Sequence, residues 1–365
     1  MKALLLGDVC ATKTTGDGFF KKDIDTLFGN TVELFRNTDL NMVNLECALT
    51  ERDCEIPKIG PALKSPLQTA EVLSALGVHC CNLSNNHSFD FGIAGIRDTF
   101  EALKKSNVLY TGFGENEEDA RRNFVFEKDG ERISIVAVCE KEYTYALRDR
   151  MGARAYDEYD TMEDIRLAKE SSDHVIVIYH GGKEHCEFPS PRLRKLCHAM
   201  IKNGADLILC QHSHCIGCYE EFNGGHILYG QGNFHFIYEN IPSESSFEMW
   251  NTSLAAHYDT KKNTITFTPV VVNDMQNGIR QANEEEAKAI LSAFQKRSEM
   301  LKTDAWEDGW REFCKKVGPS YYKRVIREFE TDRDIEVFAH FLDCQAHTDV
   351  WREIFPTQNQ FNEKN

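Results

Sequence analysis

The sequence lacks any apolar run long enough to cross a membrane as a helix. No stretch approaches the roughly 20 apolar residues of a bilayer-spanning helix. At the N-terminus, "MKALLLGDVC" has one lysine and a few apolar residues before Asp8, whereas the apolar part of an export signal has about 7–15 residues. These absences exclude a helical membrane protein, and from them we expect a cytoplasmic location.

The sequence also lacks an excess of basic residues. The chain has 42 Lys and Arg residues against 58 Asp and Glu residues, and its formal net charge is −16. Proteins with a general affinity for nucleic acid or for an anionic membrane carry a basic surface, so we expect neither partner. An anionic substrate, small or polymeric, stays compatible with this charge, because bound divalent cations can invert the local field.

Internal repeats, low-complexity segments and a disulfide framework are absent as well. The 13 cysteines have no regular spacing, and 365 residues can bury a sizeable core without covalent cross-links. We therefore expect reduced thiols. Cys215 and Cys218 form a C-x-x-C pair, which leaves a zinc or redox pair open as an alternative.

What is present is an alternation of short apolar runs and amphipathic segments. Runs such as "KALLLGDV" and "HVIVIYH" predict buried strands, and Asp129-Gly130 between two alternating runs predicts a hairpin. Ser65 and Pro66 predict the start of a helix. This order indicates an α/β fold with a mixed sheet. From residue 284 the pattern becomes helical and strongly charged, so we divide the chain into a body of residues 1–283 and a C-terminal helical extension of residues 284–365.

Polar side chains gather where the predicted strands end. Each of five strands is followed by one or two of the residues Asp8, Glu46, Asn86, His87, His180, His212 and His214. Because ligands of open α/β sheets bind outside the carboxyl ends of the strands, these residues predict one shared polar site. Taken singly, each has another interpretation: Asp8 as a cap, Glu46 as a surface charge, and Asn86 with His87 as a turn.

Two carboxylates, an amide and several imidazoles suit a divalent metal such as Mn, Fe or Zn. The set is too large for one tetrahedral ion, whereas two ions about 3.5–4 Å apart that share a carboxylate fit it better. In the H-S-H motif, His212 and His214 can chelate from an extended loop, since their side chains are two positions apart.

Several motifs in sequence order carry a resemblance to a known family. They are "GDV" at 7–9, "NLE" at 44–46, "NLSNNHSFDFG" at 82–92, "HGGKE" at 180–184, "GADLILCQHSH" at 204–214 and "LYGQGNF" at 228–234. Over residues 3 to about 236 the chain resembles the CapA-type (poly-γ-glutamate synthesis) family of the calcineurin-like metallophosphoesterase superfamily. The resemblance implies a four-layer αββα sandwich for the body, with a metallophosphoesterase-like catalytic function.

The resemblance also implies roles for individual residues. It makes Asp8, Glu46, Asn86, His180, His212 and His214 the ligands of a dinuclear site, with Glu46 as the bridge. His87 becomes the catalytic histidine that is not a ligand, with Asp90 as its partner, and Lys64 becomes a basic group that meets the anionic substrate. Many superfamily members have His where this chain has Cys10, which implies a first metal ion with fewer ligands, a thiolate ligand or weak occupancy.

From these features we expect a metal-dependent phosphoesterase that uses a bridging hydroxide and is linked to capsule or poly-γ-glutamate metabolism. A metal-dependent γ-glutamyl or amide hydrolase and a non-catalytic accessory binding protein are the alternatives. The sequence indicates no particular oligomeric state.

Overall fold

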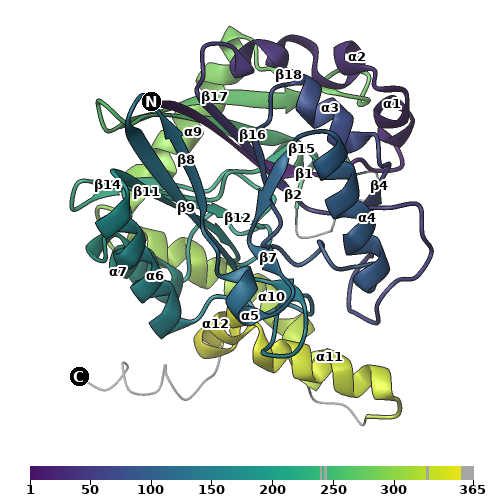
Figure 1. Cartoon of the computed structure of the whole chain (residues 1–365). Coiled ribbons are helices and arrows are strands. Elements are labelled where there is room, and N and C mark those ends of the chain that lie inside the picture. Colours follow the sequence, from purple (N-terminus) through teal and green to yellow (C-terminus); the bar gives the residue numbers. More distant parts are fainter. Residues whose placement is uncertain (239–240, 242–244, 326–328, 355–365) are drawn as a thin grey trace.

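Two β-sheets form the body of the molecule. The computed structural model describes residues 1–238, 241, 245–325 and 329–354, and Figure 1 shows strands through the middle of the molecule with helices on the outside. The first sheet has the order β18-β17-β16-β1-β2-β5-β6, with β15 paired to β1. Its strands are β1 (Lys2–Val9), β2 (Leu40–Leu45), β5 (Cys80–Asn82), β6 (Leu109–Thr111), β15 (Asn233–His235), β16 (Thr252–Asp259), β17 (Thr264–Val272) and β18 (Ile279–Gln281).

The second sheet has the order β13-β14-β12-β11-β9-β8. Its inner strands β9, β11, β12 and β14 are parallel, and β8 and β13 are antiparallel to their neighbours. Its strands are β8 (Phe124–Lys128), β9 (Glu131–Cys139), β11 (His174–His180), β12 (Leu207–Gln211), β13 (Tyr219–Phe222) and β14 (Gly225–Tyr229). Two short ladders lie outside both sheets: β3 (Ala48–Leu49) with β4 (Lys64–Ser65), and β7 (Phe113–Gly114) with β10 (Gly152–Ala153).

Strand β11 shows why the two sheets pack face to face. Val175 and Val177 belong to a cluster with the outer helices, whereas Ile176 and Ile178 belong to the cluster between the sheets. Side chains alternate between the two faces of a strand, so a strand buried on both faces needs a continuous apolar run such as "HVIVIY".

Helices cover the outer face of each sheet. Helices α3 and α4 bury Val72 and Ile96 against the first sheet, and α6 and α7 bury Ile165 and Leu196 against the second. The order helix, sheet, sheet, helix confirms the predicted αββα sandwich. The helices of the body are α1 (Gly16–Lys21), α2 (Ile24–Phe28), the 3-10 helix η1 (Gly29–Phe35), α3 (Thr69–Ala75), α4 (Gly92–Lys105), α5 (Glu117–Ala120), α6 (Glu158–Ser171), α7 (Pro191–Lys202) and α8 (Phe247–Trp250).

Two local predictions had different outcomes. The hairpin between β8 and β9 is confirmed, because Asp129 and Gly130 have φ angles of 54° and 78°, as a type I′ turn requires. The helix start at Ser65 is wrong, since α3 begins at Thr69 and Ser65 ends β4. The hydroxyl of Ser65 accepts a hydrogen bond of 2.8 Å from the backbone N–H of Ala11, so a contact distant in sequence replaces the cap.

Four helices follow residue 283: α9 (Glu284–Met300), α10 (Ala305–Val325), α11 (Asp332–Asp343) and α12 (Gln345–Ile354). Phe294 of α9 lies in the core between the two sheets. Helices α10 to α12 have a cluster of their own, with Trp310, Phe341 and Val350 around Cys186 of the body. Residues 355–365 of the predicted extension lie outside the described residues. None of the described helices has the length and apolar character needed to cross a bilayer.

Candidate metal centre

The carboxyl ends of both sheets deliver the predicted residues to one place. Asp8 is the penultimate residue of β1 and Glu46 follows β2, while His180 ends β11 and His212 follows β12 by one residue. The first two come from one sheet and the last two from the other. The site therefore lies where the carboxyl edges of the two sheets meet, and all of these side chains are buried.

Glu46 is shared by two groups of potential ligands. Asp8, Glu46 and His180 offer atoms within 4.8 Å of one another, and Glu46, His212 and His214 do the same. Within the described residues, both carboxylate oxygens of Glu46, Oδ2 of Asp8 and Nδ1 of His212 are buried without a hydrogen-bond partner. Buried polar atoms without partners are costly, and carboxylate and imidazole are ligands of Mn, Fe and Zn. The residues therefore fit a divalent-metal site, and Glu46 belongs to both groups of candidate ligands.

Neighbouring amides orient the imidazoles of the site. Nδ1 of His214 lies 2.8 Å from Oδ1 of Asn233. This contact makes Nδ1 the donor, which leaves Nε2 of His214 free to act as a ligand. Nε2 of His180 lies 3.0 Å from Oδ1 of Asn86 and 3.3 Å from Glu46, so the Asn86 oxygen lies beside the first group of ligands.

A layer of asparagines behind the site explains the Asn85-Asn86-His87 run. Oδ1 of Asn44 accepts hydrogen bonds from the side-chain amides of Asn82 and Asn85, at 2.9 Å and 3.0 Å. Oδ1 of Asn85 accepts from the backbone N–H groups of His87 and Ser88. Asn85 thus folds the turn, while its two successors face the site.

His212 and His214 are not on an extended loop as predicted. Their φ angles are 82° and 51°, in the left-handed region that costs a residue other than glycine about 1–3 kcal/mol. Such strain persists where surrounding contacts impose it, and it clusters at functional sites.

The charges of the site are unbalanced. Burial and the nearby Glu46 carboxylate raise the pKa of Asp8 to about 6. Burial lowers the pKa of His180 well below its usual range, as a neutral metal ligand requires. Burial also lowers the pKa of His212, but Glu142 and other carboxylates outweigh it and raise that pKa to about 10. Carboxylates therefore dominate the local field, which favours bound cations.

His87 lies beside this centre and is held by two charged residues. Its Nδ1 is 2.6 Å from Oδ2 of Asp90, and Lys58 donates a hydrogen bond of 2.6 Å to Oδ1 of Asp90. Within the described residues, Nε2 of His87 has no hydrogen-bond partner, and His87 lines the neighbouring pocket. Asp90 therefore holds the ring of His87 through Nδ1 at the edge of the pocket.

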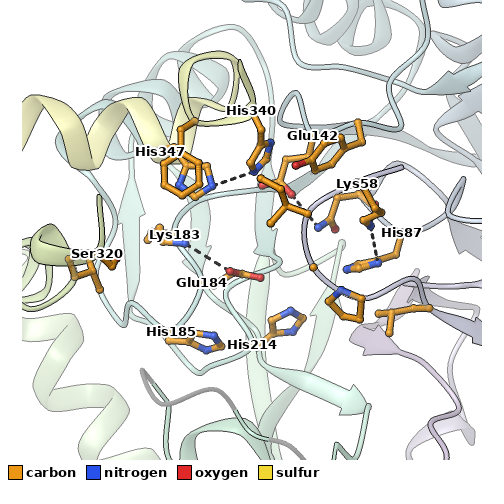
Figure 2. Close-up of a pocket in the computed structure, with 18 of the residues that line it drawn as sticks. Lys58, His87, Glu142, Lys183, Glu184, His185, His214, Ser320, His340 and His347 are labelled. Carbon is orange, nitrogen blue, oxygen red and sulfur yellow. Dashed lines mark hydrogen bonds and ion pairs between the residues drawn. The ribbon is translucent and has the colours of Figure 1, made fainter. Parts of the chain in front are cut away.

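The pocket in front of these residues has a volume of about 420 Å³, within the usual range for a small-molecule site. Figure 2 shows His87 on one side of it, with Lys183 and Ser320 on the other. Helices α10, α11 and α12 supply Ser320, Tyr321, Arg324, His340, Phe341 and His347 to its wall. The sequence predicted these helices but gave them no function.

Glu142 and Lys58 belong to the site and were missed. Glu142 accepts a hydrogen bond of 2.9 Å from the Asn86 amide and lies 3.5 Å from Nε2 of His212. Although burial raises the pKa of Glu142, the charge of His212 holds it well below its usual range. No signal in the sequence indicates either residue, since Glu142 lies in a loop and Lys58 is one basic residue among several in "EIPKIGPALK".

The structure does not bring Lys64 to the pocket. Its ammonium group lies 2.5 Å from Asp53 and 2.8 Å from the carbonyl oxygen of Arg52, near the surface. Lys58, six positions earlier, is the lysine that lines the pocket.

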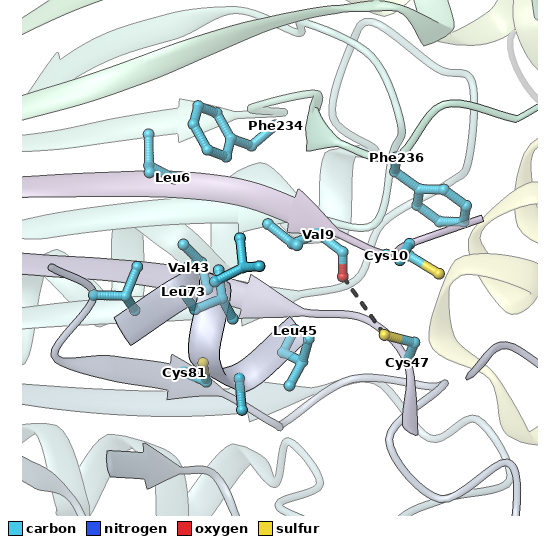
Figure 3. Close-up of a cluster of buried hydrophobic side chains, with 14 of the residues drawn as sticks. Leu6, Val9, Cys10, Val43, Leu45, Cys47, Leu73, Cys81, Phe234 and Phe236 are labelled. Carbon is cyan, nitrogen blue, oxygen red and sulfur yellow. Dashed lines mark hydrogen bonds between the residues drawn. The ribbon is translucent and has the colours of Figure 1, made fainter. Parts of the chain in front are cut away.

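Cys10 is not among the residues whose atoms group as metal ligands in the described part of the chain. It lies in the apolar cluster of the first sheet, near Cys47 (Figure 3). A hydrogen bond with Cys47 and burial raise the pKa of Cys10 well above its usual range, which disfavours a thiolate. All thirteen cysteines are free thiols, as predicted.

Comparisons with known proteins agree with the resemblance. The chain is 27% identical over 324 residues to the PGA biosynthesis protein CapA of Bacillus subtilis, covering 85% of this chain and 81% of that protein. It is 28% identical over 241 residues to the capsule biosynthesis protein CapA of Bacillus anthracis, covering 64% of this chain and 55% of that protein.

Solved structures match at low similarity. A novel phosphatase of Mycoplasma pneumoniae has a TM-score of 0.47 and 14% identity, covering 79% of this chain and 96% of that chain. A putative 5'-nucleotidase of Staphylococcus aureus has a TM-score of 0.45 and 12% identity, covering 81% of this chain and 58% of that chain.

The family comparison covers most of the body. Residues 2–238 match the family described as "Bacterial capsule synthesis protein PGA_cap", and this range includes every residue of the candidate metal centre named above. The chain therefore belongs to the bacterial capsule synthesis protein family PGA_cap.

Proposed function

We propose that the chain is a metal-dependent phosphoesterase that binds two divalent ions, Mn, Fe or Zn, and hydrolyses an anionic phosphate ester or anhydride. The observation that carries the proposal is the position of Glu46: its two buried oxygens have no hydrogen-bond partner in the described residues, and it is shared by both ligand groups. Asp8, Asn86, His180, His212 and His214 would complete the ligand set.

The bound ions and the protein would supply different parts of the chemistry. When bound, such a pair of cations lowers the pKa of coordinated water towards roughly 7 and neutralises charge on the phosphoryl oxygens. Asp90 accepts from Nδ1 of His87 and leaves Nε2 directed at the pocket. Nε2 would then donate a proton to the oxygen of the leaving group. Lys58 holds Asp90 in place through a buried ion pair.

The test combines metal analysis with turnover. We expect purified protein to bind about two metal ions per chain and to hydrolyse an aryl phosphate ester when Mn is added. Glu46→Gln should remove both properties, whereas His87→Ala should lower turnover and leave the bound metal unchanged. Absence of metal, together with absence of turnover over a broad phosphoester panel, would falsify the proposal.

A non-catalytic accessory role is the second candidate. A relative from Mycobacterium tuberculosis, 30% identical over 236 residues and covering 60% of this chain and 62% of that protein, is named a probable polyglutamine synthesis accessory protein. Cys10, buried in an apolar cluster, supplies no ligand where many phosphoesterases have a histidine. Metal binding without hydrolysis of phosphate esters or of γ-glutamyl amides would favour this role.

A further inference from the structure

The pocket wall farthest from His87 is built partly outside the region that matches the family. Helices α10 to α12 follow residue 238, where that match ends. Figure 2 shows Lys183 and Ser320 on this side of the pocket. Of this wall, Lys183 lies inside the matched residues 2–238, and only the part supplied by α10 to α12 lies outside them.

Lys183 brings a nearly unpaired positive charge to this wall. Its side chain is 12% exposed, and its one ion pair in the described residues is a long contact of 3.5 Å to Glu184. No hydrogen bond from its ammonium group occurs within the described part of the chain. An ammonium group has three N–H donors, and burying them without acceptors is costly. A bound anion would satisfy them.

Arg324, near the end of α10, brings a second positive charge. Its guanidinium group lies 4.7 Å from the ring centre of Phe341, and both residues line the pocket. In the described residues it has no carboxylate partner, whereas Arg311 on the same helix pairs with Glu307 at 2.5 Å. A planar guanidinium fork matches the geometry of carboxylate and phosphate groups.

The charge balance of the pocket agrees with this interpretation. The charge of Lys58 is offset by Asp90. Lys183 has only its long contact with Glu184, and Arg324 has no carboxylate partner among the described residues. These are the two positive charges that line the pocket without a close partner.

We propose that Lys183 and Arg324 form a second anion-binding subsite. The substrate would then carry two anionic groups: one at the candidate metal centre, and a carboxylate or phosphate at the far wall. The first half of this statement rests on the proposed function, and the second rests on the two cationic side chains.

Affinity measurements test the subsite without relying on turnover. The probes are methylphosphonate, phosphonates that carry a terminal carboxylate on chains of increasing length, and bisphosphonates of the same lengths. Titration calorimetry on Mn-loaded protein should show at least one two-headed probe binding about tenfold more tightly than methylphosphonate, equivalent to about 1.4 kcal/mol. The preferred series identifies the second group as carboxylate or phosphate.

Variants connect this affinity ratio to the two residues. Lys183→Met and Arg324→Gln should each lower the ratio about threefold or more, at an unchanged Kd for methylphosphonate. Lys323→Gln is the matched control, because it removes an exposed positive charge from the same helix and does not line the pocket; it should leave the ratio unchanged. Circular dichroism checks folding, and if Lys183→Met does not fold, Arg324→Gln decides alone.

Two results would overturn the subsite: no two-headed probe binds more tightly than methylphosphonate, or the ratio is unchanged in Arg324→Gln. Failure of the proposed hydrolysis is distinguished by aryl phosphate turnover. A protein that keeps the affinity ratio without turnover contradicts hydrolysis and supports the subsite. A protein that hydrolyses aryl phosphate but binds two-headed probes no more tightly than methylphosphonate supports hydrolysis and contradicts the subsite.

Discussion

Nδ1 of His87 lies 2.6 Å from Oδ2 of Asp90, and the other oxygen of Asp90 lies 2.6 Å from the ammonium group of Lys58. Both side-chain oxygens of a fully buried carboxylate are thereby occupied, and Leu63 donates a further backbone hydrogen bond of 2.8 Å. This arrangement fixes the ring of His87, which belongs to neither group of candidate metal ligands.

The first prediction concerns His87→Ala. Loss of proton transfer should lower kcat for an alkyl phosphate by about 10²–10⁴. Metal content should stay at the wild-type value, because His87 is not in either ligand group. The effect should be smaller for a nitrophenyl ester, whose leaving group needs no proton. An equal loss of kcat for the two esters would show that His87 does not protonate the leaving group.

The second prediction is a pH dependence of stability. Although burial raises the pKa of Asp90, the charges of His87 and Lys58 lower it below its ordinary value of 3.8. Ionised Asp90 therefore stabilises the folded protein above pH 3.8, the pKa of the unfolded chain. This contribution is lost as the pH falls through the lower pKa that Asp90 has in the folded protein. The difference in unfolding free energy between wild type and Asp90→Asn should thus shrink as the pH falls below 3.8. A difference that grows below pH 3.8 would contradict this account.

The sequence predicted the parts of the site that are fixed by strand ends. Asp8 and His180 lie at the ends of continuous apolar runs, and parallel strands of an α/β sheet must bring their carboxyl ends to one edge. That rule needs no knowledge of the loops. The rule applies within each sheet, and the packing of the two sheets is what brings their edges together.

The remaining parts depend on contacts that local sequence does not encode. Lys58 and Lys64 have the same charge and lie in the same segment, yet one is buried beside Asp90 and the other lies near the surface. Glu142 reaches the site from a loop. A helical pattern likewise predicts α12 but not where it docks, since its anchor Asp349 contacts Ser190, 159 residues earlier.

The third prediction concerns Glu46→Gln. In metal-free protein the variant should be more stable than wild type, because a buried carboxylate without a partner is replaced by a neutral amide. With saturating Mn the order should reverse, since a ligand at 100 times its Kd contributes about 2.7 kcal/mol to the wild type. Thermal unfolding with and without Mn measures both differences.

Glu51→Gln is the control for this experiment, because Glu51 is exposed and lies five positions away. Glu51→Gln should change the free energy of unfolding by no more than about 0.5 kcal/mol, both without metal and with saturating Mn. A Glu46→Gln variant that is less stable than wild type in both conditions would show that Glu46 has a structural partner rather than a metal.

The last prediction concerns the attachment of the C-terminal helices. Asp349 of α12 lies 2.5 Å from the hydroxyl of Ser190 and 2.8 Å from Nε of Arg192, and its side chain is 4% exposed. Asp349→Ala leaves a partly buried guanidinium with one carboxylate, Glu140, instead of two. Because Arg192 keeps Glu140, the loss is that of hydrogen bonds to a charged group, about 1.5–3 kcal/mol, and we expect a loss in this range in urea unfolding followed by tryptophan fluorescence.

The same substitution should weaken the far wall of the pocket more than the metal centre. Binding of two-headed phosphonates should fall, while methylphosphonate binding should stay at the wild-type value, because α12 contributes to the wall but to neither ligand group. Asp308→Ala on α10 is the matched control, since its carboxylate is 73% exposed and its pair with Arg311 contributes at most about 1 kcal/mol. If Asp349→Ala is no less stable than Asp308→Ala, the helices are held by their apolar cluster around Trp310 instead, and the ion pair has no part in shaping the pocket.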